Sequence, residues 1–266
     1  MNDATSPASL HDLLQGRLGS VMRIPVRDSR LTCRVCLGPL SRPGLAMCWQ
    51  CRRHALRAGR DGWRLADRVI ALTHSVDGEQ SNVDMHRYKA LASDEERFTT
   101  DAWQRLSLLV AAFGLRHAVC LDAASRLPVS RVTTVPSLRG RPGPHPLAAL
   151  TAHLPRAWRP APLVPALHVP EQVRRLLDPR HFTVTDPGGV AGRHVCVFED
   201  TWVRGGHAQS AAAALHAAGA AEVTILAIAR RLAPSYAQNR AFIEDRRQDY
   251  ALDHCPVSPG SCPAPD

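Results

Sequence analysis

The sequence predicts an α/β protein in which helices cover both faces of a parallel sheet. The main observation lies near the end of the chain, where two mostly apolar runs, 194–198 and 222–229, flank an alanine-rich helical segment. A strand, a helix and a second strand in such close succession form a βαβ unit, whose parallel strands are buried on both faces. The length of 266 residues leaves room for one domain of this kind and a small satellite.

The other elements follow from the spacing of apolar residues. Residues 101–113 carry apolar side chains at helical intervals and precede Gly114, a suitable C-cap for this helix. Short apolar runs predict strands. In order, we expect a helix over 9–15, a strand over 69–73, the helix over 101–113, strands over 118–121 and 131–135, and a helix over 147–154.

In the C-terminal half, we expect a loop over 200–206 and a helix over 208–218, which Gly219 ends. The chain after residue 235 is polar and then rich in proline, so the tail from Pro256 is expected to be disordered. These boundaries divide the chain into an N-terminal extension (1–30), a cysteine-containing module (31–60), the main α/β domain (61–235) and a C-terminal tail (236–266).

Arginine dominates the charge of the chain. The formal net charge is +9, and Lys89 is the single lysine. Such an excess favours an anionic partner, whether a phosphate-bearing small molecule, a nucleic acid or an acidic protein, although a solvated arginine-rich surface is the alternative. The longest apolar run, 106–115, is far shorter than the roughly 20 residues of a membrane span. With no export signal at its start, the chain is expected to be cytoplasmic, with reduced cysteines and no membrane span.

Four cysteines predict a zinc module. Cys33 and Cys36 form one Cys-x2-Cys pair, Cys48 and Cys51 form another, and eleven residues separate the two pairs. Two such pairs complete a closed tetrahedral site of four thiolates, so we expect structural zinc that supports folding or docking rather than catalysis. The alternative is that four reduced cysteines have this spacing by chance.

The remaining cysteines and the tryptophan of the module are expected to be structural. Trp49 should pack on the metal-binding turn rather than stack on a base. Cys120 and Cys196 lie in apolar runs and are expected in the core, whereas Cys255 and Cys262 are scattered near the end of the chain.

Two acidic residues mark the end of the strand over 194–198. Glu199 and Asp200 stand where open parallel sheets bind ligands, and adjacent carboxylates can accept hydrogen bonds from the hydroxyls of a ribose. Gly205 and Gly206 follow at the start of a helix, where free N–H groups and the helix dipole favour a phosphate. The alternative is an acidic, solvent-exposed turn.

Residues 195–207 (Val-Cys-Val-Phe-Glu-Asp-Thr-Trp-Val-Arg-Gly-Gly-His) resemble the phosphoribosyl-pyrophosphate signature of type I phosphoribosyltransferases, an apolar strand followed by two acidic residues and a glycine-containing loop. Residues 87–89 (Arg-Tyr-Lys) and 135–141 (Val-Pro-Ser-Leu-Arg-Gly-Arg) are similar to the basic-aromatic segment and the pyrophosphate loop of this class. With four cysteines in front of such a domain, the chain resembles the competence-associated ComF family over roughly residues 33–231.

This resemblance implies a type I phosphoribosyltransferase-like domain that binds a ligand such as phosphoribosyl pyrophosphate, with transferase activity. Glu199 and Asp200 would hold the ribose hydroxyls at the catalytic centre, and magnesium would bridge the pyrophosphate to the sugar. The residues that would bind the phosphates are Ser137, Arg139 and Arg141 for the pyrophosphate and Arg204, Gly205, Gly206, His207 and Ser210 for the 5-phosphate.

Two departures from the family pattern support an alternative. Glu199 stands where aspartate is usual, and Val203, Arg204 and His207 occupy positions of the loop threonines. The alternative is a catalytically degenerate adaptor in DNA uptake or processing, which would bind single-stranded DNA or a helicase-like protein. The retained acidic pair and glycines favour ligand binding, so both hypotheses stay open. Trp202, beside the pair, is expected either to stack on a bound ring or to pack.

Overall fold

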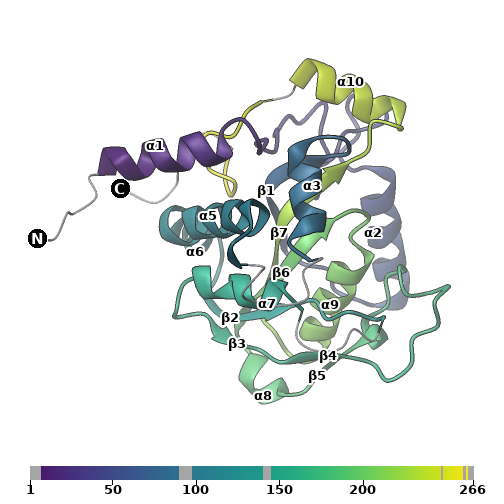
Figure 1. Cartoon of the computed structure of the whole chain (residues 1–266). Coiled ribbons are helices and arrows are strands. Elements are labelled where there is room, and N and C mark those ends of the chain that lie inside the picture. Colours follow the sequence, from purple (N-terminus) through teal and green to yellow (C-terminus); the bar gives the residue numbers. More distant parts are fainter. Residues whose placement is uncertain (1–6, 90–97, 140–144, 247, 260–261, 263–266) are drawn as a thin grey trace, which may run out of the picture.

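A parallel five-stranded sheet with helices on both faces forms the body of the protein (Figure 1). The computed structural model describes residues 7–89, 98–139, 145–246, 248–259 and 262. The strands of the sheet are β1 (Arg68–Val76), β2 (Val129–Thr134), β3 (Arg159–Pro160), β6 (His194–Trp202) and β7 (Glu222–Leu232), in the spatial order β1-β7-β6-β2-β3. A separate antiparallel pair consists of β4 (Leu163–Pro165) and β5 (Phe182–Val184).

Helices form most of the connections between these strands. The α-helices are α1 (Pro7–Leu18), α2 (Trp49–Asp61), α3 (Gln80–Arg87), α5 (Asp101–Arg116), α6 (Ala118–Ala123), α7 (Leu147–Leu150), α8 (Pro187–Val190), α9 (Gly206–Ala217) and α10 (Ala237–Arg246), and the 3-10 helices are η1 (Thr151–His153) and η2 (Pro179–His181). The unit β6–α9–β7 is the βαβ unit expected from the sequence, and its two strands pair in parallel.

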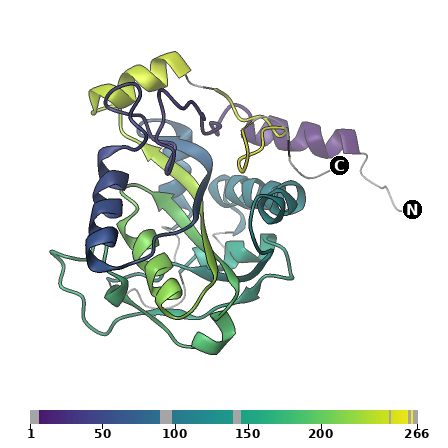
Figure 2. The ribbon, with the colours of Figure 1, turned by 180° about the vertical axis from the view of Figure 1, so that it is seen from behind.

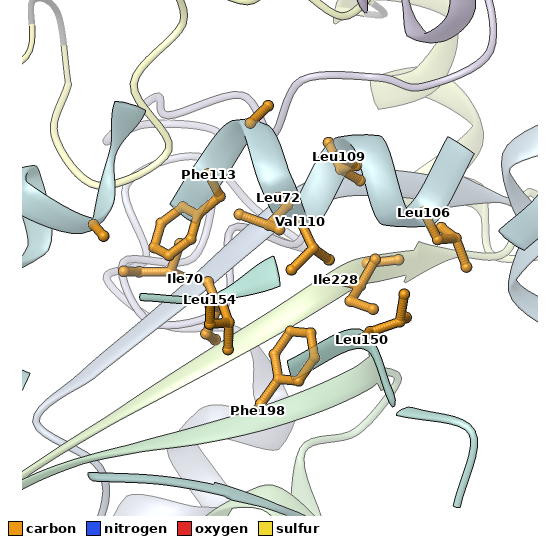
Figure 3. Close-up of a cluster of buried hydrophobic side chains, with 14 of the residues drawn as sticks. Ile70, Leu72, Leu106, Leu109, Val110, Phe113, Leu150, Leu154, Phe198 and Ile228 are labelled. Atoms are coloured by element: carbon orange, nitrogen blue, oxygen red, sulfur yellow. The ribbon is translucent and has the colours of Figure 1, made fainter. Parts of the chain in front are cut away.

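Alternate residues of the central strands contribute to two separate cores. On β6, Cys196 and Phe198 belong to the core that α5 covers, whereas Val195 and Val197 belong to the core that α9 covers. Figure 3 shows side chains of α5 packed against β6 and β7 in the first core. The two helices lie on opposite faces of the sheet in Figure 1 and Figure 2. The central strands are therefore buried on both faces, which confirms the expected parallel sheet flanked by helices.

The cysteine module packs on the same face of the sheet as α9. Cys33, Cys36 and Cys51 are buried in one cluster with residues of β6, β7 and α9. Helix α2, which begins directly after Cys48, lies along this face (Figure 2). The module therefore shares a hydrophobic core with the main domain.

Two elements in the first half differ from the sequence-based expectation. Residues 118–121 belong to helix α6 and not to a strand, because a short apolar run fits a buried helix as well as a buried strand. Helix α5 continues through Gly114 to Arg116, so Gly114 is not a C-cap. A Cβ atom at Gly114 would lie 2.3 Å from the carbonyl oxygen of His153, and the glycine therefore allows α5 to pack closely on η1.

The C-terminal half also differs at two places. Strand β6 continues to Trp202, so Glu199 and Asp200 lie within the strand and the loop is shorter than expected. The tail contains helix α10, and Val257 beyond Pro256 is only 3% exposed in the core under α5, so disorder does not begin at Pro256. Backbone hydrogen bonds from the N–H of Tyr250 to the carbonyls of Gly19 and Met22 join this segment to the chain after α1.

Candidate functional site

The order of the strands changes direction between β2 and β6. Strand β3 lies outward of β2 on one side, whereas β6 and then β7 follow on the other side. In open parallel sheets, the crevice at the carboxyl ends of two such diverging strands is the common ligand site. A cavity of about 480 Å³ lies there, lined by the loop after β2, by Glu199 and Asp200 of β6, and by the segment before η2.

Asp200 is held by two residues that directly follow α3. Its carboxylate accepts a hydrogen bond from the Tyr88 hydroxyl at 3.1 Å and forms an ion pair with Lys89. The Asp200 side chain is 13% exposed, so these contacts lie in a largely desolvated position. Tyr88 and Lys89 belong to the basic-aromatic segment that carried the family resemblance, and the fold brings this segment to the acidic pair.

The two carboxyl groups have opposite pKa shifts. Burial, and then the charge of Asp200, raise the pKa of Glu199 well above its usual range. Burial acts in the same direction on Asp200, but the nearby charge of Lys89 outweighs it and lowers the pKa of Asp200. Glu199 is therefore expected to retain a proton next to an ionised Asp200. Its Oε2 atom is buried and has no hydrogen-bond partner among the described residues.

The loop after β6 requires glycine at two positions. Gly205 has a φ of +76°, and a Cβ atom there would lie 2.2 Å from the ring of Trp202. A Cβ atom at Gly206 would lie 2.3 Å from the carbonyl oxygen of Arg175. Trp202 is only 2% exposed and packs under Gly205, so its ring is not available to stack on a ligand.

Helix α9 begins at this loop, and its first N–H groups lie at the carboxyl end of the parallel strands. Gly205 occupies the N-cap and has no side chain that could accept from these N–H groups. A second cavity of about 240 Å³ adjoins the helix start and is lined by residues 201–208 together with Glu199, Arg175 and Arg231. Glu199, Arg175 and His207 line both cavities, so the two spaces are neighbours.

The structure brings most of the predicted ligand-binding residues to these two cavities. Ser137 and Arg139 line the larger one together with Glu199 and Asp200. Arg204, Gly205, Gly206 and His207 line the smaller one. Burial is the main cause that lowers the pKa of His207, which keeps its imidazole neutral near pH 7. Arg141 lies outside the described residues.

Ser210 lies elsewhere. Its side chain is fully buried one turn inside α9, where the hydroxyl donates to the Gly206 carbonyl at 2.7 Å and accepts from the N–H of Asp178 at 2.9 Å. The contact with Asp178 holds the helix start against the segment before η2. Ser210 therefore supports the loop and does not line either cavity.

Several residues of the larger cavity were not predicted. Arg174, Arg175 and Glu171 come from the segment between β4 and η2, and His145 comes from the region before α7. The pair Arg174-Arg175 was the available signal in the sequence, since two adjacent arginines in a ligand-binding domain suit a polyanion. With these residues, the cavity combines an acidic end at Glu199 and Asp200 with several cationic side chains.

The first four cysteines converge as a metal-binding group. The four Sγ atoms all lie within 4.8 Å of one another, and Cys36 and Cys48 are 3.7 Å apart. A turn with Leu37 at a φ of 56° brings Cys33 and Cys36 together, and Cys51 lies in the first turn of α2. This geometry confirms a cluster that could hold a metal ion.

Arg230 of β7 connects the cysteine module to the loop. Its Nη1 atom donates to the carbonyls of Trp202 at 3.2 Å and Val203 at 3.3 Å. On the other side, a Cβ atom at Gly38 would lie 2.5 Å from this guanidinium group. Arg230 therefore contacts both the turn that follows Cys36 and the loop after β6.

Trp49 does not pack as expected. Its side chain is 68% exposed at the start of α2, and the guanidinium of Arg53 lies 5.9 Å from the ring centroid.

Among the described residues, no helix has the length and apolar character needed to cross a membrane. Comparison with protein-family models, with curated proteins and with solved structures gives no match for this chain.

Proposed function

We propose that the cavity at the end of β6 binds a ribose phosphate that carries a pyrophosphate, such as phosphoribosyl pyrophosphate. The carrying observation is that two adjoining cavities bring together the acidic pair, the glycine turn at the start of α9, and five arginines, Arg139, Arg174, Arg175, Arg204 and Arg231. In this proposal Asp200 holds the ribose hydroxyls, the N–H groups at the start of α9 hold the 5-phosphate, and Arg139 with Arg174 and Arg175 hold the pyrophosphate.

The chemistry that suits this arrangement is transfer of the ribosyl group. Pyrophosphate would leave with the electron pair of its bond to the ribosyl carbon, and an acceptor nucleophile would form the new bond there. The ionised Asp200 can stabilise the positive charge that develops on the sugar without forming a covalent bond. Magnesium, when bound with the pyrophosphate, would neutralise its charge. Positioning and electrostatics carry such a reaction, so no nucleophilic side chain is needed. Membership of the ComF family is part of this proposal, as is zinc as the metal held by the first four cysteines.

Calorimetry with phosphoribosyl pyrophosphate and magnesium tests the proposal. We expect the unmodified protein to bind, and Asp200→Asn to weaken binding by about 1.5–3 kcal/mol, the range for hydrogen bonds to a charged group. Asp186→Asn is the control, because Asp186 caps α8 and lies outside both cavities. Absence of binding at millimolar ligand, or an equal loss in both variants, would contradict the proposal.

A second candidate function has its own observation. One face of α2 exposes Trp49, Arg52, Arg53, Leu56 and Arg60, at spacings that place them along one side of the helix. An exposed aromatic ring among arginines suits single-stranded nucleic acid, because bases stack on the ring and the arginines contact phosphates. We propose binding of single-stranded DNA at this face as the alternative, adaptor-type function.

A further inference from the structure

Two neighbouring residues at the end of α5 meet two cysteines from the end of the chain. His117 separates α5 from α6, Cys120 lies one turn further on, and Cys255 and Cys262 come from the end of the chain. One ligand atom from each residue lies within 4.8 Å of each of the others. Cys120 lies in the core, as its apolar run predicts, and the fold also brings Cys255 and Cys262, which are scattered in the sequence, to the same histidine.

The distances within this cluster fit a metal tetrahedron. With Zn–S bonds near 2.3 Å and Zn–N bonds near 2.0–2.1 Å, a tetrahedral site has edges of about 3.8 Å between sulfurs and about 3.6 Å between sulfur and nitrogen. The Nδ1 atom of His117 lies 3.5 Å from the Sγ of Cys262 and 3.9 Å from the Sγ of Cys120. The cysteine pair Cys36 and Cys48 of the first cluster has a comparable separation of 3.7 Å.

Local structure fixes the direction of each side chain. His117 and Cys120 are three positions apart at the start of a helix, so both side chains lie on one face of α6. The C-terminal segment is anchored independently of the cysteines, since Leu252 and Val257 are buried in the core under α5. Packing alone therefore delivers Cys255 to the cluster, and Cys262 reaches it from the partly exposed side.

The surroundings suit a metal held by three thiolates and one imidazole. Such a set with a divalent ion has a net charge of −1, and the guanidinium of Arg27 interacts electrostatically with Cys255. Arg116 lies next to His117 in the sequence and pairs with Asp253 of the C-terminal segment at 3.2 Å. His117, Cys120 and Cys255 are buried, so water has little access to the site from their side.

We propose that His117, Cys120, Cys255 and Cys262 bind a second zinc ion. Four protein ligands leave no open position, so this zinc is structural. It would join the end of the chain to the break between α5 and α6 and thereby hold the C-terminal segment over the first core. The proposal is independent of the ligand site at β6 and of the metal at Cys33, Cys36, Cys48 and Cys51.

The metal content of the full-length protein tests this proposal. Mass spectrometry under non-denaturing conditions, with elemental analysis of the same sample purified without chelator, should give two zinc ions per chain. Cys262→Ser should give one, and this position is the least disruptive choice because Cys262 is only partly buried. Cys36→Ser should also give one, and the double variant should give none. Cys196→Ala, which changes a buried cysteine of β6 outside both clusters, should keep two.

Two outcomes would overturn the proposal. One is a single zinc per unmodified chain that Cys36→Ser removes and Cys262→Ser leaves in place. The other is a disulfide between two of Cys120, Cys255 and Cys262, detected by thiol counting in freshly purified protein, because an oxidised pair cannot supply thiolate ligands. Cobalt substitution adds a readout that does not depend on folding of a variant. The unmodified protein should take up two cobalt ions, both with the strong visible absorption of tetrahedral thiolate sites.

Discussion

Glu199 and Asp200 are adjacent in the chain, yet their surroundings separate their protonation states. Lys89 and Tyr88 contact Asp200 and favour its ionised form, whereas burial and the charge of Asp200 keep a proton on Glu199. A neutral carboxyl beside a carboxylate can donate a hydrogen bond to a ligand, which two carboxylates cannot do. The hydrogen bond between the two carboxyl groups also raises the pKa of Glu199 and lowers that of Asp200, so the pair presents a single negative charge at this end of the cavity.

Replacement of Glu199 by glutamine should change how stability depends on pH. A carboxyl whose pKa is raised on folding stabilises the protein most below its unfolded pKa of about 4.3, and this contribution falls as the pH rises towards the folded pKa. Glu199→Gln keeps the neutral form at every pH. The variant should therefore have a higher free energy of unfolding than the wild type, and this difference should grow by about 1.4 kcal/mol per pH unit above pH 5 until the folded pKa of Glu199 is reached.

Urea unfolding between pH 5 and pH 9 measures this effect. Glu171→Gln is the control, because Glu171 lines the same cavity from an exposed position. The charges of Asp200 and Lys89 shift the pKa of Glu199, so both residues stay unchanged in the comparison. Parallel pH profiles for wild type and Glu199→Gln would show that Glu199 ionises normally in the folded protein.

Residue by residue, the sequence predicted the part of the site that is local in the chain. Glu199, Asp200, Gly205 and Gly206 follow one strand, so one motif reveals them all. The contacts of Asp200 with Tyr88 and Lys89 depend on how α3 packs on β1 and α5, which no local pattern specifies. The same is true of the cluster at His117, whose four members span almost 150 residues of the chain.

At the scale of elements, the turn between β6 and α9 has little freedom to change. Gly205→Ala would place a residue with a Cβ atom at a φ of +76°, which costs about 1–2 kcal/mol, and against the Trp202 ring, which adds about 1–3 kcal/mol. We expect the substitution to lower the free energy of unfolding by about 2–5 kcal/mol. The substitution should also weaken the binding of a phosphate at the start of α9.

Gly59→Ala provides the matched control for this prediction. Gly59 lies in helix α2, has no atoms within 4 Å of an added Cβ, and should gain about 1 kcal/mol from the higher helix propensity of alanine. Denaturant unfolding of both variants measures the contrast. A neutral Gly205→Ala would mean that the loop can relax away from Trp202.

Element types were predictable where a long pattern exists and ambiguous where it does not. The β6–α9–β7 unit has two long apolar strands and a capped helix, and all three elements form. The run at 118–121 has only four residues, and a buried helix and a buried strand have the same composition at that length. Gly114 shows a second limit of prediction from sequence. A glycine after an apolar helical segment usually indicates a C-cap, but here Gly114 lies inside α5 and allows close packing on His153.

At the scale of the whole molecule, the arginine excess serves two different surfaces. Arg139, Arg174 and Arg175 face the cavity beside the acidic pair, so part of the net charge of +9 lies at this cavity. Arg52, Arg53 and Arg60 instead face solvent on α2, beside the exposed Trp49. Composition predicted an anionic partner, but only the fold separates these two groups of arginines.

The exposed face of α2 allows a prediction for nucleic-acid binding that separates phosphate contacts of the arginines from base stacking on Trp49. If this face binds single-stranded DNA, replacing Arg52 and Arg53 with alanine should reduce the slope of log affinity against log salt by about 1.4, because each lost phosphate contact accounts for about 0.7. Trp49→Ala should weaken binding by about 1–3 kcal/mol and leave the slope unchanged, since stacking releases no counterions.

Fluorescence anisotropy with a labelled oligonucleotide at several salt concentrations measures both quantities. Arg193→Ala, which removes an exposed arginine outside α2, should change neither. Equal slopes in all variants, or no binding at low salt, would mean that the arginines of α2 form only a solvated surface.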